Sequence, residues 1–123
     1  MNGINKVILV GNLGADPEVK ALGNGDKVMN LRVATSETWR DRETGQPVEK
    51  TEWHRVVIFN EHLINYGEKA LVKGTTVYLE GKIQTRKWTD NTGQEKYSTE
   101  IVMQKFQGEL QAVGGKRREQ SAE

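Results

Sequence analysis

The stretch TEWHRVVIFNEHLINYGEKALVKG, residues 51–74, is where the spacing of apolar residues changes from one period to another. Alternation over residues 51–60 predicts a strand, because successive side chains of a strand point to opposite faces. In residues 60–74 the apolar side chains recur at intervals of three and four, which predicts one face of a short helix. The stretch therefore predicts a strand followed directly by a single helix.

The strand predicted over residues 51–60 has two unlike faces. One face is apolar after its first member and is predicted to line a core; it consists of His54, Val56 and Ile58. The other face carries two aromatic rings spaced around an arginine; it consists of Trp53, Arg55, Val57 and Phe59. An aromatic and cationic row on the face away from the core indicates a binding surface.

The helix predicted after this strand has sequence signals at both ends. Asn60 is placed to cap it, and Glu61 lies in its positively polarised first turn. Lys73 and Gly74 supply a cation and a left-handed stop at the other end. We therefore expect a short helix between two strands.

Four further strands are predicted from alternating apolar residues, at residues 4–10, 28–39, 75–88 and 96–106. The order is three strands, one helix and two strands. This order matches an all-β fold, the five-stranded oligonucleotide/oligosaccharide-binding (OB) barrel, a Greek-key barrel with one short helix between strands 3 and 4. From Gln107 onward the periodicity is lost. We expect the domain to occupy residues 1–107 and residues 108–123 to form a flexible tail.

Composition limits the possible functions. The chain has 123 residues, of which 35% are hydrophobic and 28% charged, as expected for one soluble domain. No apolar run is long enough to span a membrane. The absence of cysteine excludes a disulfide scaffold, a thiol nucleophile and a thiolate metal site. The net charge of +1 means that attraction to a polyanion must depend on where the basic residues lie.

Aromatic and basic residues occur together at three places: Trp39 with Arg40 and Arg42, Trp53 and Phe59 around Arg55, and Trp88 after Arg86 and Lys87. This combination is typical of single-stranded nucleic acid sites. Exposed bases stack on aromatic faces, at roughly 1–3 kcal/mol per base, while cations follow the phosphates. Stacking tolerates any base, so this chemistry predicts little sequence preference.

Other interpretations stay open at this point. Any one tryptophan is as readily a core residue as a stacking platform, and acidic residues dilute the charge of the first loop. An RNA-binding or primosomal replication-restart module on the same barrel would show similar residues. So would an oligomerisation or protein-docking domain. An enzyme, such as a metal-dependent nuclease, is disfavoured because the acidic residues are scattered and the two histidines are isolated. We expect no metal and no cofactor.

The sequence resembles the bacterial single-stranded DNA-binding protein family over residues 3–113. The resemblance is carried by the segments NKVILVGNLGADPEV, ATSETWRD, TEWHRVV, KG, VYLEGKIQTRKWTD and GQEKYSTE, which follow one another in the family's order. It implies a homotetramer that binds single-stranded DNA in replication, recombination and repair, without catalysis, in the cytoplasm and associated with the nucleoid.

The resemblance also implies roles for individual residues. The residues expected to stack on bases are Trp39, Trp53, Phe59 and Trp88. The residues expected to contact phosphates are Arg40, Arg42, Arg55, Lys73, Arg86 and Lys87. The residues expected at subunit contacts are Ile4, Lys6, Ile8, His54 and Tyr78, with the first strand pairing with its counterpart in a neighbouring subunit.

Two departures from the family pattern qualify these expectations. Family members usually end in an acidic tip that recruits replication and repair proteins, whereas this sequence ends in KRREQSAE. We expect such partners only if a full-length acidic tail exists. In addition, Glu61 and Ala70 stand where relatives can offer a basic or aromatic group, so no DNA contact is expected from the helix.

Overall fold

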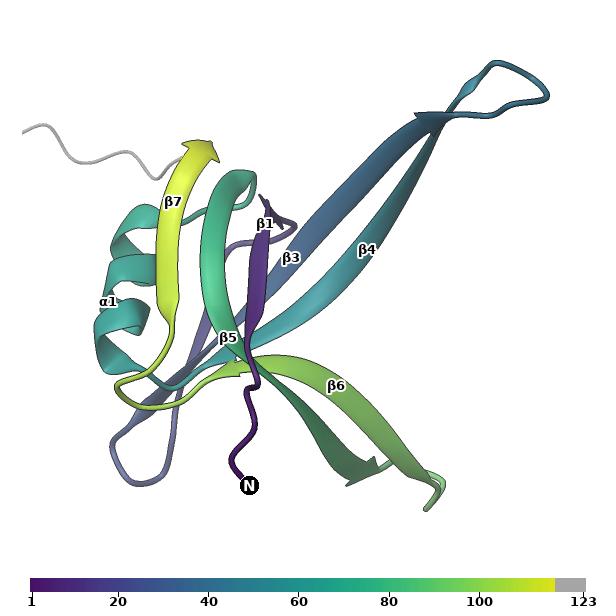
Figure 1. Cartoon of the computed structure of the whole chain (residues 1–123). Coiled ribbons are helices and arrows are strands. Elements are labelled where there is room, and N and C mark those ends of the chain that lie inside the picture. The colour runs from purple at the N-terminus through teal and green to yellow at the C-terminus, as the bar shows by residue number, and fades with distance from the viewer. Residues whose placement is uncertain (117–123) are drawn as a thin grey trace, which may run out of the picture.

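The computed structural model describes residues 1–116 and consists of strands with a single helix (Figure 1). The elements are β1 (Val7–Leu13), β2 (Glu18–Ala21), β3 (Lys27–Arg40), β4 (Pro47–Ile58), α1 (Glu61–Ala70), β5 (Thr75–Thr89), β6 (Glu95–Met103) and β7 (Glu109–Gly115).

Five of the strands close into a ring. The hydrogen-bonded order runs β1, β3, β4, β6, β5, and β5 returns to pair with β1. β4 and β6 run parallel, whereas the other neighbours in this ring are antiparallel. The predicted five-stranded OB barrel is confirmed, and its helix lies between β4 and β5, the third and fourth strands of the ring along the chain.

Two additional strands extend this ring. β2 pairs with β3, and β7 pairs with β5 over Thr75–Glu80. The prediction that the chain becomes a flexible tail at residue 108 is therefore wrong for β7, whose Leu110 is only 7% exposed. In this segment glycine and polar residues interrupt the alternation of apolar residues that would predict a strand. The segment is ordered by its hydrogen bonds with β5. The expected tail beyond residue 116, including its lack of an acidic tip, lies outside the described residues.

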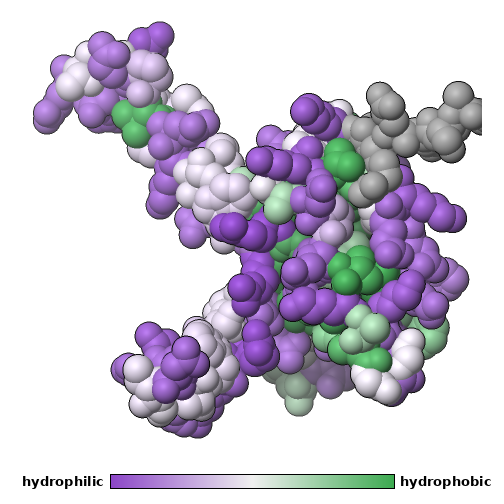
Figure 2. Space-filling view, turned by 180° about the vertical axis from the view of Figure 1, so that it is seen from behind, coloured by the Kyte–Doolittle hydropathy of each residue, from purple (hydrophilic) through white to green (hydrophobic). Residues whose placement is uncertain are grey.

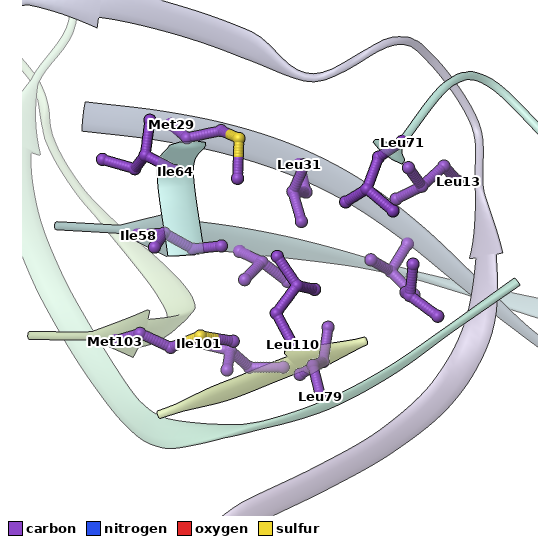
Figure 3. Close-up of a cluster of buried hydrophobic side chains, with 13 residues drawn as sticks. Leu13, Met29, Leu31, Ile58, Ile64, Leu71, Leu79, Ile101, Met103 and Leu110 are labelled. Atoms are coloured by element: carbon purple, nitrogen blue, oxygen red, sulfur yellow. The ribbon is translucent and has the colours of Figure 1, made fainter. Parts of the chain in front are cut away.

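The apolar side chains that alternate along the strands meet inside the barrel. Val56 and Ile58 of β4 are fully buried, as predicted from their positions. They pack with the inward residues of the neighbouring strands (Figure 3); these include Leu13, Met29, Leu31, Val33, Leu79, Ile101 and Met103. Burying such a side chain contributes about 1.5–3 kcal/mol, so this core sets the register of every strand around it.

The helix α1 closes one end of the core. The side-chain oxygen of Asn60 accepts hydrogen bonds from the backbone N–H groups of His62 and Leu63, at 3.1 and 3.4 Å. The predicted N-cap is thus present. The helix ends at Ala70, before the expected stop, and Gly74 takes its positive φ of 95° in the turn that leads into β5.

Two hairpins extend beyond the barrel as arms. One is the outer part of β3 and β4, and the other is the outer part of β5 and β6 (Figure 1). Seen from behind, the two arms are separated by a hollow whose visible walls are mainly hydrophilic (Figure 2). Within residues 1–116 no helix is long and apolar enough to cross a membrane.

Candidate nucleic-acid interface

The hollow between the arms is lined by basic and aromatic side chains from four strands. A space of about 450 Å³ is bordered by Arg55 of β4, by Arg86 and Trp88 of β5, and by Tyr97 and Ser98 of β6. An adjoining space of about 500 Å³ shares two of these residues and adds Arg32 of β3. Because the same two arginines border both, the spaces form one continuous surface, which we call the arm cleft.

All three tryptophans are exposed on the arms. Trp39, Trp53 and Trp88 are 48%, 51% and 42% exposed. Tryptophan is largely buried in most proteins, so three exposed indole rings beside cations indicate a ligand surface rather than a core. The three tryptophans are therefore surface residues and not core residues.

Trp53 is held in a fixed position on the barrel side of its arm. Its ring lies so close to Gly14 that a Cβ atom on that glycine would stand 2.3 Å from the ring atom Cζ3. The guanidinium carbon of Arg32 lies 4.9 Å from the ring centroid, a cation–π arrangement. The cross-strand register sets Arg32 directly opposite Arg55. One indole ring and two guanidinium groups therefore share one face of the β3–β4 hairpin.

Arg55 and Arg86 meet at a buried carboxylate. The Glu100 side chain is 7% exposed, and its Oε2 atom accepts a hydrogen bond from Nη2 of Arg86 at 3.0 Å. The same oxygen lies 3.6 Å from Nη1 of Arg55. Both arginine side chains remain more than half exposed, at 59% and 56%. Glu100 thus orients two cations, whose outer N–H groups stay free to contact an anion.

Trp39 does not lie beside Trp53. The β3–β4 register pairs Trp39 with Val48 and Trp53 with Ala34. Five positions along β3, or about 17 Å of strand, separate Trp39 from Ala34, and this odd spacing sets the two indoles on opposite faces. The structure therefore separates two of the predicted stacking residues along the arm.

Arg40 and Arg42 lie at the outer end of the same arm. Nη1 of Arg40 donates a hydrogen bond to the carbonyl oxygen of Gly45 at 2.8 Å, and Arg42 is exposed. Both are thus remote from the arm cleft and close to Trp39. They form a separate basic and aromatic end of the β3–β4 arm.

Lys87 and Lys73 were predicted to contact phosphates, but neither side chain borders the arm cleft. Neighbouring positions of a strand face opposite sides, so Lys87 points away from the face of Arg86, and its ammonium group is paired with Glu95. Lys73 lies in the turn before β5, where its backbone N–H donates to Oδ1 of Asp16 at 2.7 Å. Since Asp16 borders the arm cleft, Lys73 lies near its rim.

Sequence reasoning missed three residues at this site: Arg32 and Tyr97, which border the arm cleft, and Glu100, which orients its arginines. Tyr97 is 69% exposed and borders the cleft, although its cross-strand partner is Lys87. Arg32 stands in an ordinary alternating strand without an aromatic neighbour, and Glu100 resembles any polar strand residue. Only the cross-strand register brings Arg32 opposite Arg55, so no local pattern reveals it.

The residues predicted at subunit contacts lie mainly on the outer face of β1 and β5. Ile4 and Ile8 are 95% and 55% exposed. Lys6 pairs with Glu80 at 3.0 Å, and the hydroxyl of Tyr78 donates to the same carboxylate. That hydrogen bond raises the pKa of Tyr78 and lowers the pKa of Glu80.

His54 lies apart from this outer face. It is half-buried, and its Nε2 atom is 2.9 Å from Oγ1 of Thr35 on β3. The side chain therefore has a partner within its own subunit.

Comparison with known proteins finds a family model and relatives that match most of the chain. The description of the matching family is "Single-strand binding protein family", and its sequence model covers residues 4–108. A single-stranded DNA-binding protein of Rickettsia prowazekii is 52% identical over 120 residues, which cover 98% of this chain and 79% of the relative. The protein of the same description from Rickettsia felis is 56% identical over 107 residues, or 87% and 70% of the two chains.

Solved structures agree with this match. A chain described as "Plasmodium falciparum SSB complex with ssDNA" superposes with a TM-score of 0.84 at 39% identity, covering 93% of this chain and 98% of that one. A deletion mutant of the single-stranded DNA binding protein from Thermus aquaticus gives a TM-score of 0.70 at 26% identity, covering 91% and 51%.

Proposed function

The chain belongs to the single-strand binding protein family, and on that premise we propose that it binds and protects single-stranded DNA with little sequence preference during replication, recombination and repair. Relatives described as single-stranded DNA-binding proteins, and a similar chain solved with single-stranded DNA, support this function. The observation that carries it in this chain is that Trp53 and Trp88, 51% and 42% exposed, lie beside the two arginines that meet at Glu100.

The chemistry of the arm cleft suits an unpaired strand. Trp53 and Trp88 offer ring faces to bases, while the free N–H groups of Arg55, Arg86 and Arg32 donate to phosphates. A duplex hides its base faces, so stacking selects single strands. Because every base has a π face, the same contacts give little discrimination between sequences.

The rest of the predicted contacts complete the proposed site. Phe59, which directly follows β4, adds an aromatic ring beyond Arg55. Trp39, Arg40 and Arg42 contact the DNA at the end of the β3–β4 arm. Lys73 and Lys87 contact phosphates at the edge of the proposed site. The DNA thus follows both arms rather than filling a single pocket.

The protein acts as a homotetramer in this proposal. β1 pairs with β5 along Val7–Asn12 but with β3 only at Asn12 and Leu13, so within residues 1–116 one edge of β1 is left unpaired over most of its length. Ile8 and Val10 beside that edge are 55% and 56% exposed. A neighbouring copy of β1 would satisfy the edge and cover these side chains.

Catalysis is no part of the proposed function, and we place the protein in the cytoplasm, associated with the nucleoid. Among residues 1–116 no group of three or more histidine or acidic side chains is arranged to hold a metal ion. Replication and repair proteins are further partners only where an acidic tail is present.

The test is a titration of intrinsic tryptophan fluorescence with oligothymidine at several salt concentrations. We expect deep quenching with a stoichiometric end point, and a logarithmic salt slope of about −0.7 for each phosphate neutralised. Trp53→Ala and Trp88→Ala variants should each bind more weakly, and an RNA oligomer of matched length serves as competitor. Absence of quenching at every salt concentration would contradict the proposal.

A further inference from the structure

Phe106, in the turn between β6 and β7, combines two unusual properties. Its side chain is 88% exposed, and its backbone has a positive φ of 64°. A bulky residue rarely takes this left-handed conformation, which costs conformational free energy and persists only where the surroundings enforce it. The strained position and the exposed ring therefore occur at the same residue.

The turn that carries Phe106 is fastened on two sides. The side-chain amide of Asn60 donates to the carbonyl oxygen of Gln107 at 2.9 Å, which ties the turn to the start of α1. On the other side the Lys105 ammonium donates to Asp26 at 2.8 Å, which ties it to the turn before β3. These contacts hold the backbone rather than the ring. The turn is thus held in place, while the faces of the ring stay open to solvent.

Phe106 lies next to the end of the proposed DNA surface. It borders a hollow of about 160 Å³ together with Phe59, the residue that directly follows β4. The backbone N–H of Phe59 donates to Met103 at 2.8 Å, which joins the end of β4 to the end of β6. Six positions along the strand, or about 20 Å, separate Trp53 from Phe59. The Phe106 ring therefore extends an existing line of aromatic groups.

The charges around this hollow favour a base over a phosphate. Lys105 is engaged by Asp26, and Lys27 lies 3.8 Å from Glu68. Glu61 also borders the hollow. With the cations matched by carboxylates, little attraction remains for an anion, while the aromatic faces remain.

We propose that Phe106 is a further stacking platform, which takes an unpaired nucleobase of the same single strand after the strand has passed Phe59. This inference rests on the proposed binding of single-stranded DNA. It adds a binding position outside the arm cleft and gives the strained turn a function, since a fastened backbone loses little freedom when a base stacks on the exposed ring.

The test uses the substitution Phe106→Gly in the full-length protein. Glycine removes the ring and also relieves the positive φ, so the variant should remain folded and melt no lower than the wild type. We expect its affinity for a fluorescein-labelled long oligothymidine, measured by anisotropy, to fall by about 5- to 100-fold. Phe106→Trp should retain the wild-type affinity, because stacking requires only a flat ring.

Two control variants separate this inference from the proposed function. Leu22→Ala, at an exposed apolar residue of another turn, should bind as the wild type does. Trp53→Ala should weaken binding in the same assay. If Trp53→Ala weakens binding while Phe106→Gly does not, the stacking role of Phe106 is wrong and DNA binding stands. If Phe106→Gly changes only the oligomeric state in sedimentation, the ring contacts a second copy and the inference is overturned.

Discussion

The Arg86 guanidinium donates a hydrogen bond to Glu100 at 3.0 Å, and this contact joins a largely exposed cation to a buried anion. Arg55 approaches the same carboxylate from β4. Two positive charges and one negative charge therefore occupy the centre of the arm cleft, which leaves a net positive site with fixed geometry. The carboxylate stabilises the fold, yet its charge opposes a phosphate that binds nearby.

Glu100→Gln separates these two effects. We expect the free energy of unfolding to fall by about 1 kcal/mol, because a charge-assisted hydrogen bond is lost while the arginines are still hydrated. Affinity for oligothymidine at low salt should rise, with a steeper salt dependence, since one competing negative charge is gone. Chemical denaturation and a salt series of titrations measure both. Weaker binding at every salt concentration would show that orientation of the arginines outweighs charge.

Arg86→Ala and Lys87→Ala form a matched pair on neighbouring positions of β5. The Arg86 side chain borders the arm cleft, whereas Lys87 points to the other face and is paired with Glu95. Arg86→Ala should reduce the logarithmic salt slope by about 0.7, the contribution of one phosphate on a single strand. Lys87→Ala should change it less. Equal effects in titrations of both variants would mean that the DNA contacts both faces of the arm.

Gly14→Ala tests the position of Trp53 without altering the indole itself. The added Cβ would stand 2.3 Å from the ring, so the ring must move away from its place beside Arg32. We expect weaker binding of oligothymidine and less quenching of tryptophan fluorescence. Gly23→Ala is the control, because a Cβ there meets no atom within 4 Å. Unchanged quenching in Gly14→Ala would show that binding tolerates a displaced ring.

Asp26→Asn tests the contact that fastens the turn of Phe106. The hydrogen bond from Lys105 lowers the pKa of Asp26 below 3.8, so the contact stabilises the fold above that pH and is lost as pH falls through the lowered value. The same contact raises the pKa of Lys105 above 10.5. Its contribution to stability is therefore also lost as pH rises through this raised pKa.

Thermal melting between pH 2 and pH 7 should therefore show a lower midpoint for Asp26→Asn at neutral pH, with the difference vanishing in acid. In a Lys105→Met background, Asp26→Asn should lose most of this pH dependence. A difference that stays constant down to pH 2 would show that the ion pair is not its origin.

Ile8→Glu tests the assembly. Ile8 is 55% exposed beside the open edge of β1, where a neighbouring subunit would bury it. A buried, unpaired carboxylate is costly, so the variant should sediment as smaller species than the wild type. Leu22→Glu, on a different surface, should leave the sedimentation coefficient unchanged. A tetramer that survives Ile8→Glu would place the subunit contact elsewhere.

Local pattern was sufficient for the barrel and for its one helix. Alternation alone assigned Val56 and Ile58 to the core, since a strand has only two faces and one of them was apolar. Asn60 identified the start of the helix because a side-chain acceptor is needed there. The same alternation separated Trp53 and Arg55 from the core, and so indicated a surface that binds aromatic and anionic groups.

Only the tertiary structure decides which side chains of other strands lie next to Trp53 and Arg55. Arg55 and Arg86 meet at Glu100 because β6 runs between β4 and β5, and no spacing in the sequence encodes that pairing. β7 likewise becomes a strand only because β5 offers it hydrogen-bond partners. The sequence by itself determined which side chains point outward, because that depends on neighbours along the chain. Which outward side chains meet depends on register across the barrel, and register is set by how the whole core packs.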